Sequence, residues 1–224
     1  MIERIRRLFK VLPPHPYPTQ FSPEMDISND AKPSKFVLIA STPRSGSHFL
    51  GHMLMDHGDF GVPLEYLNSR NFPYWYKRFN QNDPLSVLEN IAAKRTSQNG
   101  VFTLKAHWRQ FERFESKIQE ITQGNGFSFV VWIYRRSLLN QAISLAIAQQ
   151  TQAWISGAPE LSPAVYDYKI ISNAARRISD GNNAWQRYLA VLDGVETICL
   201  CYDCLLYTSP SPRDQRGSRM PSSA

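Results

Sequence analysis

The sequence predicts an α/β domain with a mostly parallel sheet flanked by helices, and three observations carry this prediction. Short apolar runs such as FVLIAST at 36–42 are typical of strands that are buried on both faces. These runs alternate with segments of helical periodicity, which favours crossover connections between parallel strands. The 224 residues, 42% hydrophobic and 20% charged, suffice for one domain with a sizeable core.

Each predicted strand and helix is based on the local pattern of apolar residues and on residues typical of helix ends. Apolar runs predict the strands, and the terminal signals of helices divide the segments between them. Gly58 stands where a helix C-terminal cap belongs, and Asp83 precedes Pro84 at a helix start. The expected strands are 36–42, 101–108, 127–135 and 197–202, and the expected helices are 48–57, 84–95, 109–122, 137–154 and 163–192, the last broken near Gly181.

Charge and hydropathy limit the partners of the chain. The formal net charge of +6 suits an anionic small molecule, and no dense basic stripe with interleaved aromatic residues indicates nucleic acid. Because no run of ~18 apolar residues is present, we expect a cytoplasmic protein. Residues 1–34 are expected to be a leader and connector, in which the basic, apolar segment 1–12 offers at most a peripheral contact with anionic lipid.

Residues 204–224 have a different character from the rest of the chain. They follow the last expected strand without a turn signal and show no apolar period. One back-translation of 204–214 matches a transposase adapter used in sequencing libraries, so we expect translated adapter here and exclude it from the fold. The sequence therefore predicts a domain over 35–203 that is truncated at its C-terminal end.

The loop after the first strand carries the clearest chemistry. A helix N-terminus presents unpaired N–H groups that favour a phosphate, and Gly46 lets the backbone wrap the anion. Arg44 adds a charged fork, and Ser45 and Ser47 add hydroxyl donors. The lysine of the nucleoside-triphosphate loop is absent, and no later strand clearly ends in a magnesium-binding Asp. The pattern predicts a site for one phosphate group without a metal, although taken alone it also fits an ordinary turn.

A second motif follows the third strand, where Arg136 precedes Ser144 by eight residues. Sulfotransferases use such a pair for the 3'-phosphate of their donor and a loop of the first kind for its 5'-phosphosulfate. The segments TPRSGSHFL, GVPLEYLN, VFTLKAHW and YRRSLLNQAISLAIAQQTQAW, in this order, resemble the bacterial trehalose 2-sulfotransferase-like family. The resemblance covers about 35–203.

The resemblance implies a sulfotransferase variant of the P-loop fold, with 3'-phosphoadenosine 5'-phosphosulfate as co-substrate. It implies that Glu65, in a P-x-E-[YF] motif, is the catalytic base, and that Arg44 also supports catalysis. One departure is His48, where the family usually has Thr, so one hydroxyl contact is replaced by a ring nitrogen. The donor-binding residues implied are Arg44, Ser45, Gly46, Ser47, His48, Arg136 and Ser144.

Several alternatives stay open at this level. The strand–loop–helix start is shared with ATP-dependent small-molecule kinases, and a non-catalytic nucleotide-binding or interaction protein is a further reading. Arg135 replaces Arg136 if the strand register differs by one, and Lys105, interior to a strand, indicates a charged ligand or a route to solvent. We expect a carbohydrate or glycolipid acceptor. The resemblance favours a homodimer, and truncation predicts that this particular chain is inactive.

Overall fold

The computed structural model describes residues 15–155 and 157–208. Segment 1–12 and most of segment 204–224 therefore lie outside the described residues. The described strands form one sheet in the order β2-β1-β3-β4, with every neighbouring pair parallel. This confirms the predicted α/β fold with a parallel sheet. The strands are β1 Lys35–Ser41, β2 Val101–His107, β3 Phe129–Tyr134 and β4 Glu196–Cys201.

Helices cover both faces of this sheet, which explains why its strands are almost continuously apolar. On one face, Ile39 of β1 and Val131 of β3 pack with Leu50 of α2. On the other face, Leu38 of β1 belongs to the larger cluster, which also holds Trp185 of α7. The helices are α2 Ser47–His57, α3 Phe72–Phe79, α4 Pro84–Arg95, α5 Trp108–Ile121, α6 Leu138–Thr151, α7 Tyr168–Leu189 and α8 Tyr202–Thr208, and two short 3-10 helices are η1 Pro18–Phe21 and η2 Pro23–Met25.

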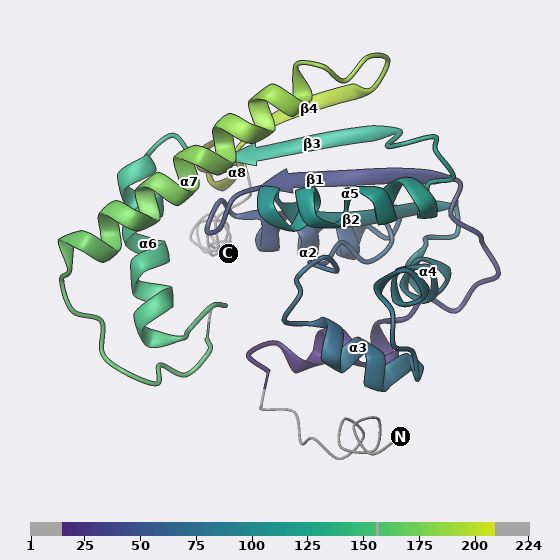
Figure 1. Ribbon diagram of the computed structural model, residues 1–224, viewed down its shortest axis with the longest axis horizontal. Helices are drawn as coiled ribbons and strands as arrows, with labels where there is room; N and C mark the ends of the chain where they lie inside the picture. Colours follow the sequence, from purple (N-terminus) through teal and green to yellow (C-terminus); the bar gives the residue numbers. More distant parts are fainter. Residues whose placement is uncertain (1–14, 156, 209–224) are drawn as a thin grey trace, which may run out of the picture.

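All four strands end at the same edge of the sheet, because parallel neighbours run in one direction. Figure 1 shows the strand arrowheads pointing to the side on which α6 and the first half of α7 project. Loops that leave β1, β2 and β3 meet at this edge. Carboxyl edges of open parallel sheets are where such folds place their ligands, so this edge is the place to look for the predicted site.

Local signals account for the ends of the helices. Gly58 caps α2 in the left-handed conformation, with φ 91°. The Asp83 side chain accepts a hydrogen bond from the backbone N–H of Ser86 at the start of α4. Ser137 caps α6 in the same way, through the N–H of Asn140. These helix ends agree with the predicted ones to within a few residues.

Three elements differ from the prediction. α7 runs through Gly181 without the predicted break, because the missing Cβ serves close packing: a Cβ there would lie 2.8 Å from Thr42 Cγ2. α3 was not predicted, and it forms by burying Phe72 and Trp75. α8 continues from Tyr202 into segment 204–224, for which no element was predicted. The adapter origin of that segment stays a prediction.

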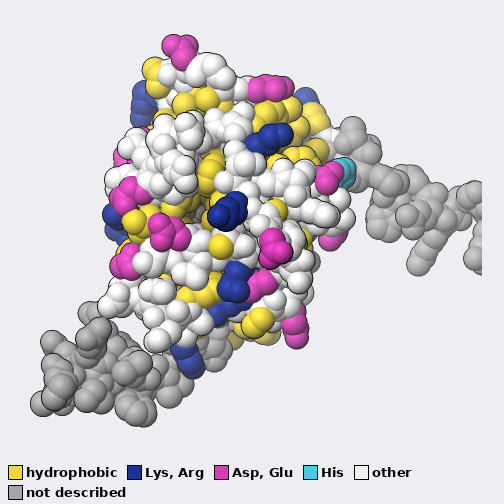
Figure 2. Space-filling view, turned by 90° about the vertical axis from the view of Figure 1, so that its right-hand side faces the viewer, with side chains coloured by type: hydrophobic (Ala, Val, Ile, Leu, Met, Phe, Trp, Pro, Cys, Tyr) yellow, Lys and Arg dark blue, Asp and Glu magenta, His cyan; other side chains and the backbone are white. Residues whose placement is uncertain are grey.

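The surface of the described residues carries mixed charge on the face shown in Figure 2. Lys and Arg side chains alternate there with Asp and Glu, and no continuous basic stripe crosses this face. Among the helices of residues 15–155 and 157–208, none has the length and apolar character that crossing a bilayer demands.

Candidate active site at the carboxyl edge of the sheet

The loop between β1 and α2 forms a concave cradle of backbone amides. Arg44 and Gly46 both adopt positive φ, at 64° and 88°, and a tight turn is closed by Ser45 N–H to the Thr42 carbonyl at 3.2 Å. Alternation of left-handed and ordinary residues turns successive N–H groups toward one point. Left-handed backbone is costly for a non-glycine residue such as Arg44, and such strain is typical of functional loops. The α2 N-terminus adds its own free amides to the cradle.

The hydroxyl of Ser45 is the clearest sign of a ligand in the loop. Ser45 is fully buried, and its Oγ has no hydrogen-bond partner among the described residues. An unsatisfied buried hydroxyl costs about 1–3 kcal/mol, so native proteins rarely keep one without reason. An anion bound in the cradle would accept this hydrogen bond.

Two helices hold the loop from behind. Gln141 of α6 donates to Thr42 Oγ1 at 3.0 Å and to the Pro43 carbonyl at 2.7 Å. From α7, Trp185 Nε1 donates to the Ser41 carbonyl at 2.8 Å, and Asn182 accepts from Thr42 Oγ1 at 3.2 Å. The loop is therefore fixed by side chains more than ninety residues away in sequence, and its conformation does not depend on local preference alone.

Glycine is required at position 46 for two reasons. Its φ of 88° is unfavourable for other residues, and a Cβ there would lie 2.0 Å from a ring carbon of Tyr202. Tyr202 thus packs directly on the loop from the end of β4. The Arg135 guanidinium lies over this ring, 5.2 Å from its centroid, so Tyr202 links the loop to the end of β3.

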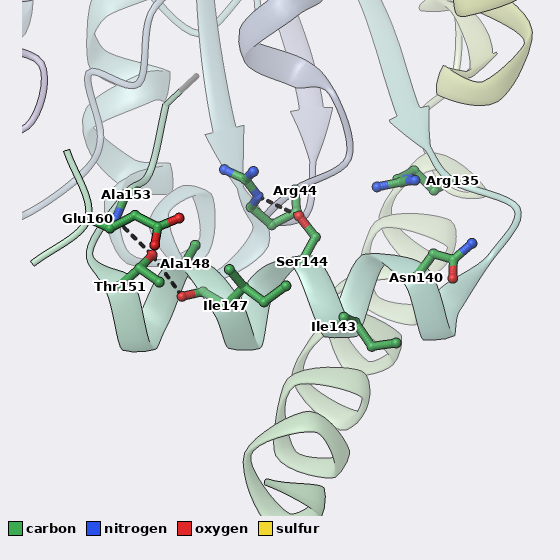
Figure 3. A pocket seen from close by; sticks show the side chains of 10 residues that line it. All are labelled: Arg44, Arg135, Asn140, Ile143, Ser144, Ile147, Ala148, Thr151, Ala153 and Glu160. Carbon is green, nitrogen blue, oxygen red and sulfur yellow. Dashed lines mark hydrogen bonds between the residues drawn. The ribbon is translucent and has the colours of Figure 1, made fainter. Parts of the chain in front are cut away.

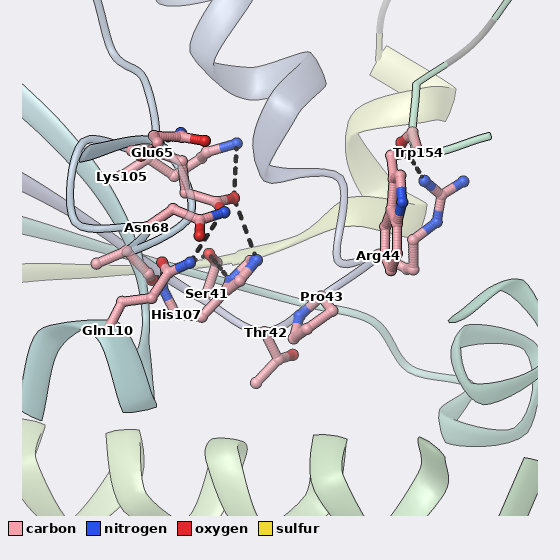
Figure 4. A network of polar contacts seen from close by, with 12 residues as sticks. Ser41, Thr42, Pro43, Arg44, Glu65, Asn68, Lys105, His107, Gln110 and Trp154 are labelled. Atoms are coloured by element: carbon pink, nitrogen blue, oxygen red, sulfur yellow. Dashed lines mark hydrogen bonds and ion pairs between the residues drawn. The ribbon is translucent and has the colours of Figure 1, made fainter. Parts of the chain in front are cut away.

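Glu65 is the centre of a polar network beside the loop (Figure 4). Backbone pairing of Leu64 with β2 brings it to the sheet edge, through Lys105 N–H to the Leu64 carbonyl at 2.9 Å. Its carboxylate accepts hydrogen bonds from two side-chain amides at one oxygen and faces two basic side chains at the other. Lys105 Nζ and His107 Nε2 lie 3.5 and 3.2 Å from Oε1, and Asn68 Nδ2 and Gln110 Nε2 lie 3.1 and 2.9 Å from Oε2.

This network sets the charge of Glu65. Burial raises the pKa of a carboxyl, but the charges of His107 and Lys105, with hydrogen bonds from His107 and Gln110, outweigh it and hold the pKa of Glu65 well below its usual value. Because a carboxylate only accepts, His107 Nε2 carries a proton. His107 Nδ1 lies 3.0 Å from Ser41 Oγ, which orients the ring. Glu65 is therefore ionised at neutral pH.

His48 lies in the first turn of α2, directly after the loop. Burial, followed by the charges of Lys105 and His52, lowers the pKa of His48 to about 4. Its ring packs edge-on against His52, with centroids 4.4 Å apart. A neutral imidazole at this place can donate one hydrogen bond without adding charge.

A cavity of about 320 Å³ opens on the other side of the loop. Arg44 reaches across it, donating from Nε to Ser144 Oγ at 3.0 Å and from its terminal nitrogen to the Trp154 carbonyl at 2.6 Å. Figure 3 shows Arg44 and Arg135 over the same face of α6 as Ser144. Arg135 Nε makes no hydrogen bond among the described residues. Two guanidinium groups and a hydroxyl thus surround one space of small-molecule size.

The structure places Arg136 elsewhere. Its side chain is exposed, its backbone N–H donates to Asp203 at 2.9 Å, and its guanidinium approaches Cys204 Sγ at 3.4 Å. The residue that lines the cavity with Ser144 is Arg135, the alternative that the sequence left open. The structure therefore brings together all of the expected site residues except Arg136.

Sequence reasoning missed the partners of Glu65. Asn68 lies three residues after Glu65 in GVPLEYLN, whereas Lys105 and His107 belong to VFTLKAHW and Gln110 follows it, so the network joins two separate segments of the sequence. A buried Lys105 inside a strand was the one available signal, and it indicated a charged group without naming it.

These residues fit the phosphate groups of a sulfuryl donor. The orphaned Ser45 hydroxyl and the amide cradle suit one phosphate. The cavity with Arg44, Arg135 and Ser144 suits a second, because guanidinium groups bind phosphate with paired donors. Both groups of residues lie on the one loop that carries Arg44 and Ser45.

Comparison with known proteins gives a family for the chain. The family model for Stf0 sulphotransferase matches residues 36–214. A trehalose 2-sulfotransferase of Mycobacterium tuberculosis (strain Erdman) is 25% identical over 208 residues, covering 75% of this chain and 77% of that protein. A solved sulfotransferase domain from the curacin biosynthetic pathway is 14% identical, with a TM-score of 0.47 over 83% of this chain and 73% of that one.

Proposed function

The chain belongs to the Stf0 sulphotransferase family, and from this we propose that it transfers a sulfuryl group from 3'-phosphoadenosine 5'-phosphosulfate to a hydroxyl of a carbohydrate or glycolipid. The observation that carries the proposal is the pairing of two anion sites with an ionised, partly buried carboxylate at one sheet edge. The carbohydrate class is supported by the trehalose 2-sulfotransferase to which the chain is similar.

In the proposed reaction the acceptor oxygen attacks the sulfur, and the bond from sulfur to the bridging oxygen of the 5'-phosphate breaks. The products are a sulfate ester and 3'-phosphoadenosine 5'-phosphate. By analogy with phosphoryl transfer, catalysis of such a displacement rests on positioning and on stabilising charge. The loop amides and the hydroxyls of Ser45 and Ser47 would hold the 5'-phosphate, and Arg44 would offset charge on the leaving oxygen.

Glu65 is proposed to take the proton of the attacking hydroxyl. It is ionised at neutral pH, and its carboxylate is fixed by four donors. Its low pKa limits its strength as a base, so the acceptor hydroxyl has to displace one of the neutral amides, Asn68 or Gln110, from Oε2. Proton transfer then occurs at the oxygen that does not face Lys105.

The 3'-phosphate is assigned to the cavity with Ser144. The family resemblance gives Arg136 as the partner of Ser144, whereas the side chain in the cavity is Arg135. We propose that Arg135 makes the main contact, because its buried Nε makes no hydrogen bond and its nearest carboxylate oxygen, Asp203 Oδ1, is 3.9 Å away. His48 takes the place of the usual threonine as a neutral donor beside the loop.

Sulfuryl transfer tests the proposal. The protein is incubated with 3'-phosphoadenosine 5'-phosphosulfate, without added metal, and with a panel of free sugars and glycolipids, and products are weighed by mass spectrometry. A sulfate ester on a sugar hydroxyl, together with 3'-phosphoadenosine 5'-phosphate, supports the proposal. A phosphate ester formed from ATP would instead identify a kinase. Formation of neither product would favour a non-catalytic role for this chain.

A further inference from the structure

A segment ahead of β1 packs against α2 and α3 beside the site, and we call residues 15–26 the strap. Its Phe21 ring stacks on Tyr74 of α3, with centroids 4.8 Å apart, and meets Trp75 edge-on at the same distance. Figure 1 shows the 3-10 helices of the strap, in purple, beside α3. The strap precedes the region that the family model matches, which begins at residue 36, so the family match assigns it no role.

A buried arginine anchors the strap to the core. Arg95 of α4 is fully buried, and its Nη2 donates to the carbonyl of Gln20 at 2.8 Å and to that of Ser22 at 3.4 Å. Its Nε lies 3.4 Å from Asp26 Oδ1, an acid of the strap. A buried guanidinium needs such partners, because an unpaired buried charge is strongly unfavourable. The strap is therefore a packed part of the fold.

His15 joins the strap to Asn71, and its partners fix its tautomer. The backbone N–H of Tyr17 donates to His15 Nδ1 at 3.0 Å, so this nitrogen is an acceptor. A neutral ring then carries its proton on Nε2, which donates to Asn71 Oδ1 at 3.0 Å. Because Asn71 is buried, loss of this partner would leave its oxygen unsatisfied.

Asn71 in turn holds the turn that carries Glu65. Its backbone N–H donates to the Asn68 carbonyl at 2.8 Å, and its side-chain Nδ2 donates to the Glu65 carbonyl at 3.3 Å. The same Nδ2 donates to Gln20 Oε1 of the strap at 3.2 Å. Asn68 also donates to the Glu65 carboxylate. The strap therefore supports, through one buried amide, the turn that presents the proposed base.

Tyr17 connects the strap to the other side of the site. Its ring meets the His48 ring edge-on, with centroids 5.3 Å apart, and its hydroxyl lies 3.4 Å from His52 Nε2. His48 and His52 are four residues apart and share one face of α2, so Tyr17 completes a cluster of three rings. His48 directly follows the loop. Tyr17 and His15, two residues apart, thus reach the loop side and the Glu65 side.

Building on the proposed function, we infer that the strap positions the two sides of the acceptor site. Tyr17 fixes the His48 ring beside the loop, and His15 fixes the Glu65 turn through Asn71. In the proposed reaction the sulfur is held at the loop and the proton is taken by Glu65, so the acceptor hydroxyl has to fit between them. Tyr17 and His15 act through other residues and are positioning residues.

The contact between Tyr17 and His48 is tested by NMR. The His48 ring signal, assigned by its loss in His48→Gln, is followed as the pH is lowered. Burial is the main reason that the pKa of His48 is lowered to about 4, so Tyr17→Ala, which exposes the ring, should raise this pKa toward the ordinary value of about 6.5. Tyr17→Phe keeps the ring contact and should keep the low pKa. An unchanged His48 titration in Tyr17→Ala would overturn the inference.

Steady-state kinetics tests the positioning, with the sugar that the transfer assay identifies as acceptor. Tyr17→Ala should raise the acceptor KM by about threefold to tenfold, the scale of one aromatic pair, and Tyr17→Phe should restore it. His15→Ala should lower kcat by about tenfold or more, because displacement of a base from its geometry slows proton transfer. His15→Gln, whose amide both donates and accepts, should retain more of kcat.

The matched control is Thr19→Ala, at an exposed position of the strap, which should keep kcat, KM and melting temperature. Binding of 3'-phosphoadenosine 5'-phosphate, measured by calorimetry, should be the same in all of these variants. Values of kcat and KM in Tyr17→Ala and His15→Ala equal to those of Thr19→Ala would overturn the inference. So would a loss of activity that only follows the loss of folded protein and of donor binding, because it would show a structural role.

These experiments separate the strap from the proposed function. If a sugar is sulfated and the strap variants behave as Thr19→Ala does, the inference fails while the sulfotransferase proposal stands. If no sugar is sulfated and the His48 titration still responds to Tyr17→Ala but not to Tyr17→Phe, the proposed function fails and the fixing of His48 by the strap stands.

Discussion

Replacing Glu65 with glutamine isolates the charge of the proposed base from its shape. The four donors around the carboxylate approach within 2.9 to 3.5 Å. A glutamine side chain has one acceptor oxygen, so its amide nitrogen must face donors on one side. Lys105, which is 5% exposed, also loses its counter-ion. Unmatched donors of this kind cost roughly 1–3 kcal/mol, so we expect a stable but weakened protein.

The catalytic effect of Glu65→Gln should exceed this structural cost. Loss of a general base lowers turnover by about 10²–10⁴-fold, whereas binding of 3'-phosphoadenosine 5'-phosphate should be unchanged, because Glu65 lies outside the cavity. Turnover is measured with saturating donor and corrected for the folded fraction. Glu120→Gln is the matched control, since Glu120 is exposed and pairs only with Lys117. Turnover of Glu65→Gln within about threefold of the parent would refute the base role.

The pH dependence of stability gives a second check on Glu65. Its folded-state pKa is lowered, so its contribution to the free energy of unfolding is present above the unfolded value of about 4.3 and is lost as the pH falls toward the folded value. The difference in melting temperature between the parent and Glu65→Gln should therefore shrink below about pH 4. A difference that stays constant well below pH 4 would show that the lost stability comes from packing.

Three further predictions concern the donor side. Arg135→Ala should weaken 3'-phosphoadenosine 5'-phosphate roughly tenfold or more in calorimetry, and Arg136→Ala much less; the reverse order would return the contact to Arg136. His48→Gln should remove part of the loss of stability that occurs as the pH falls from about 6.5 toward 4, because a folded pKa of about 4 lets the unfolded chain bind more protons in this range; equal pH profiles of melting temperature would contradict this. Gly46→Ala should abolish donor binding, whereas Gly58→Ala, with the same backbone strain but no atom within 4 Å of the new Cβ, should cost stability alone.

The fold followed from the sequence wherever hydrophobic pattern and capping agreed. The apolar runs of β1 and β3 allow little but buried parallel strands, and Asp83 and Gly58 mark helix ends by their own chemistry. α3 escaped prediction because it is short and is formed by tertiary burial of Trp75. The predicted break of α7 at Gly181 was wrong for a related reason. A glycine inside a helix suggests a break, but here it allows close packing against Thr42, which is distant in the sequence.

The site was predictable where one segment holds both the backbone shape and the functional groups. Ser45 and Gly46 lie in such a segment, and the structure shows a loop suited to an anion. The setting of Glu65 was not predictable, because Lys105 and Gln110 come from other elements and meet it only through the sheet. The position of Arg135 depends on where β3 ends, and a one-residue difference in that end changes which arginine enters the cavity.

Titration of 3'-phosphoadenosine 5'-phosphate into the protein without magnesium, beside ATP and AMP, tests the central claim most directly. The account predicts selective binding of the 3',5'-bisphosphate. Arg44→Ala should weaken this binding, because Arg44 belongs to the loop and also lines the cavity with Ser144. Binding of ATP alone, and only with magnesium, would contradict it and favour a kinase.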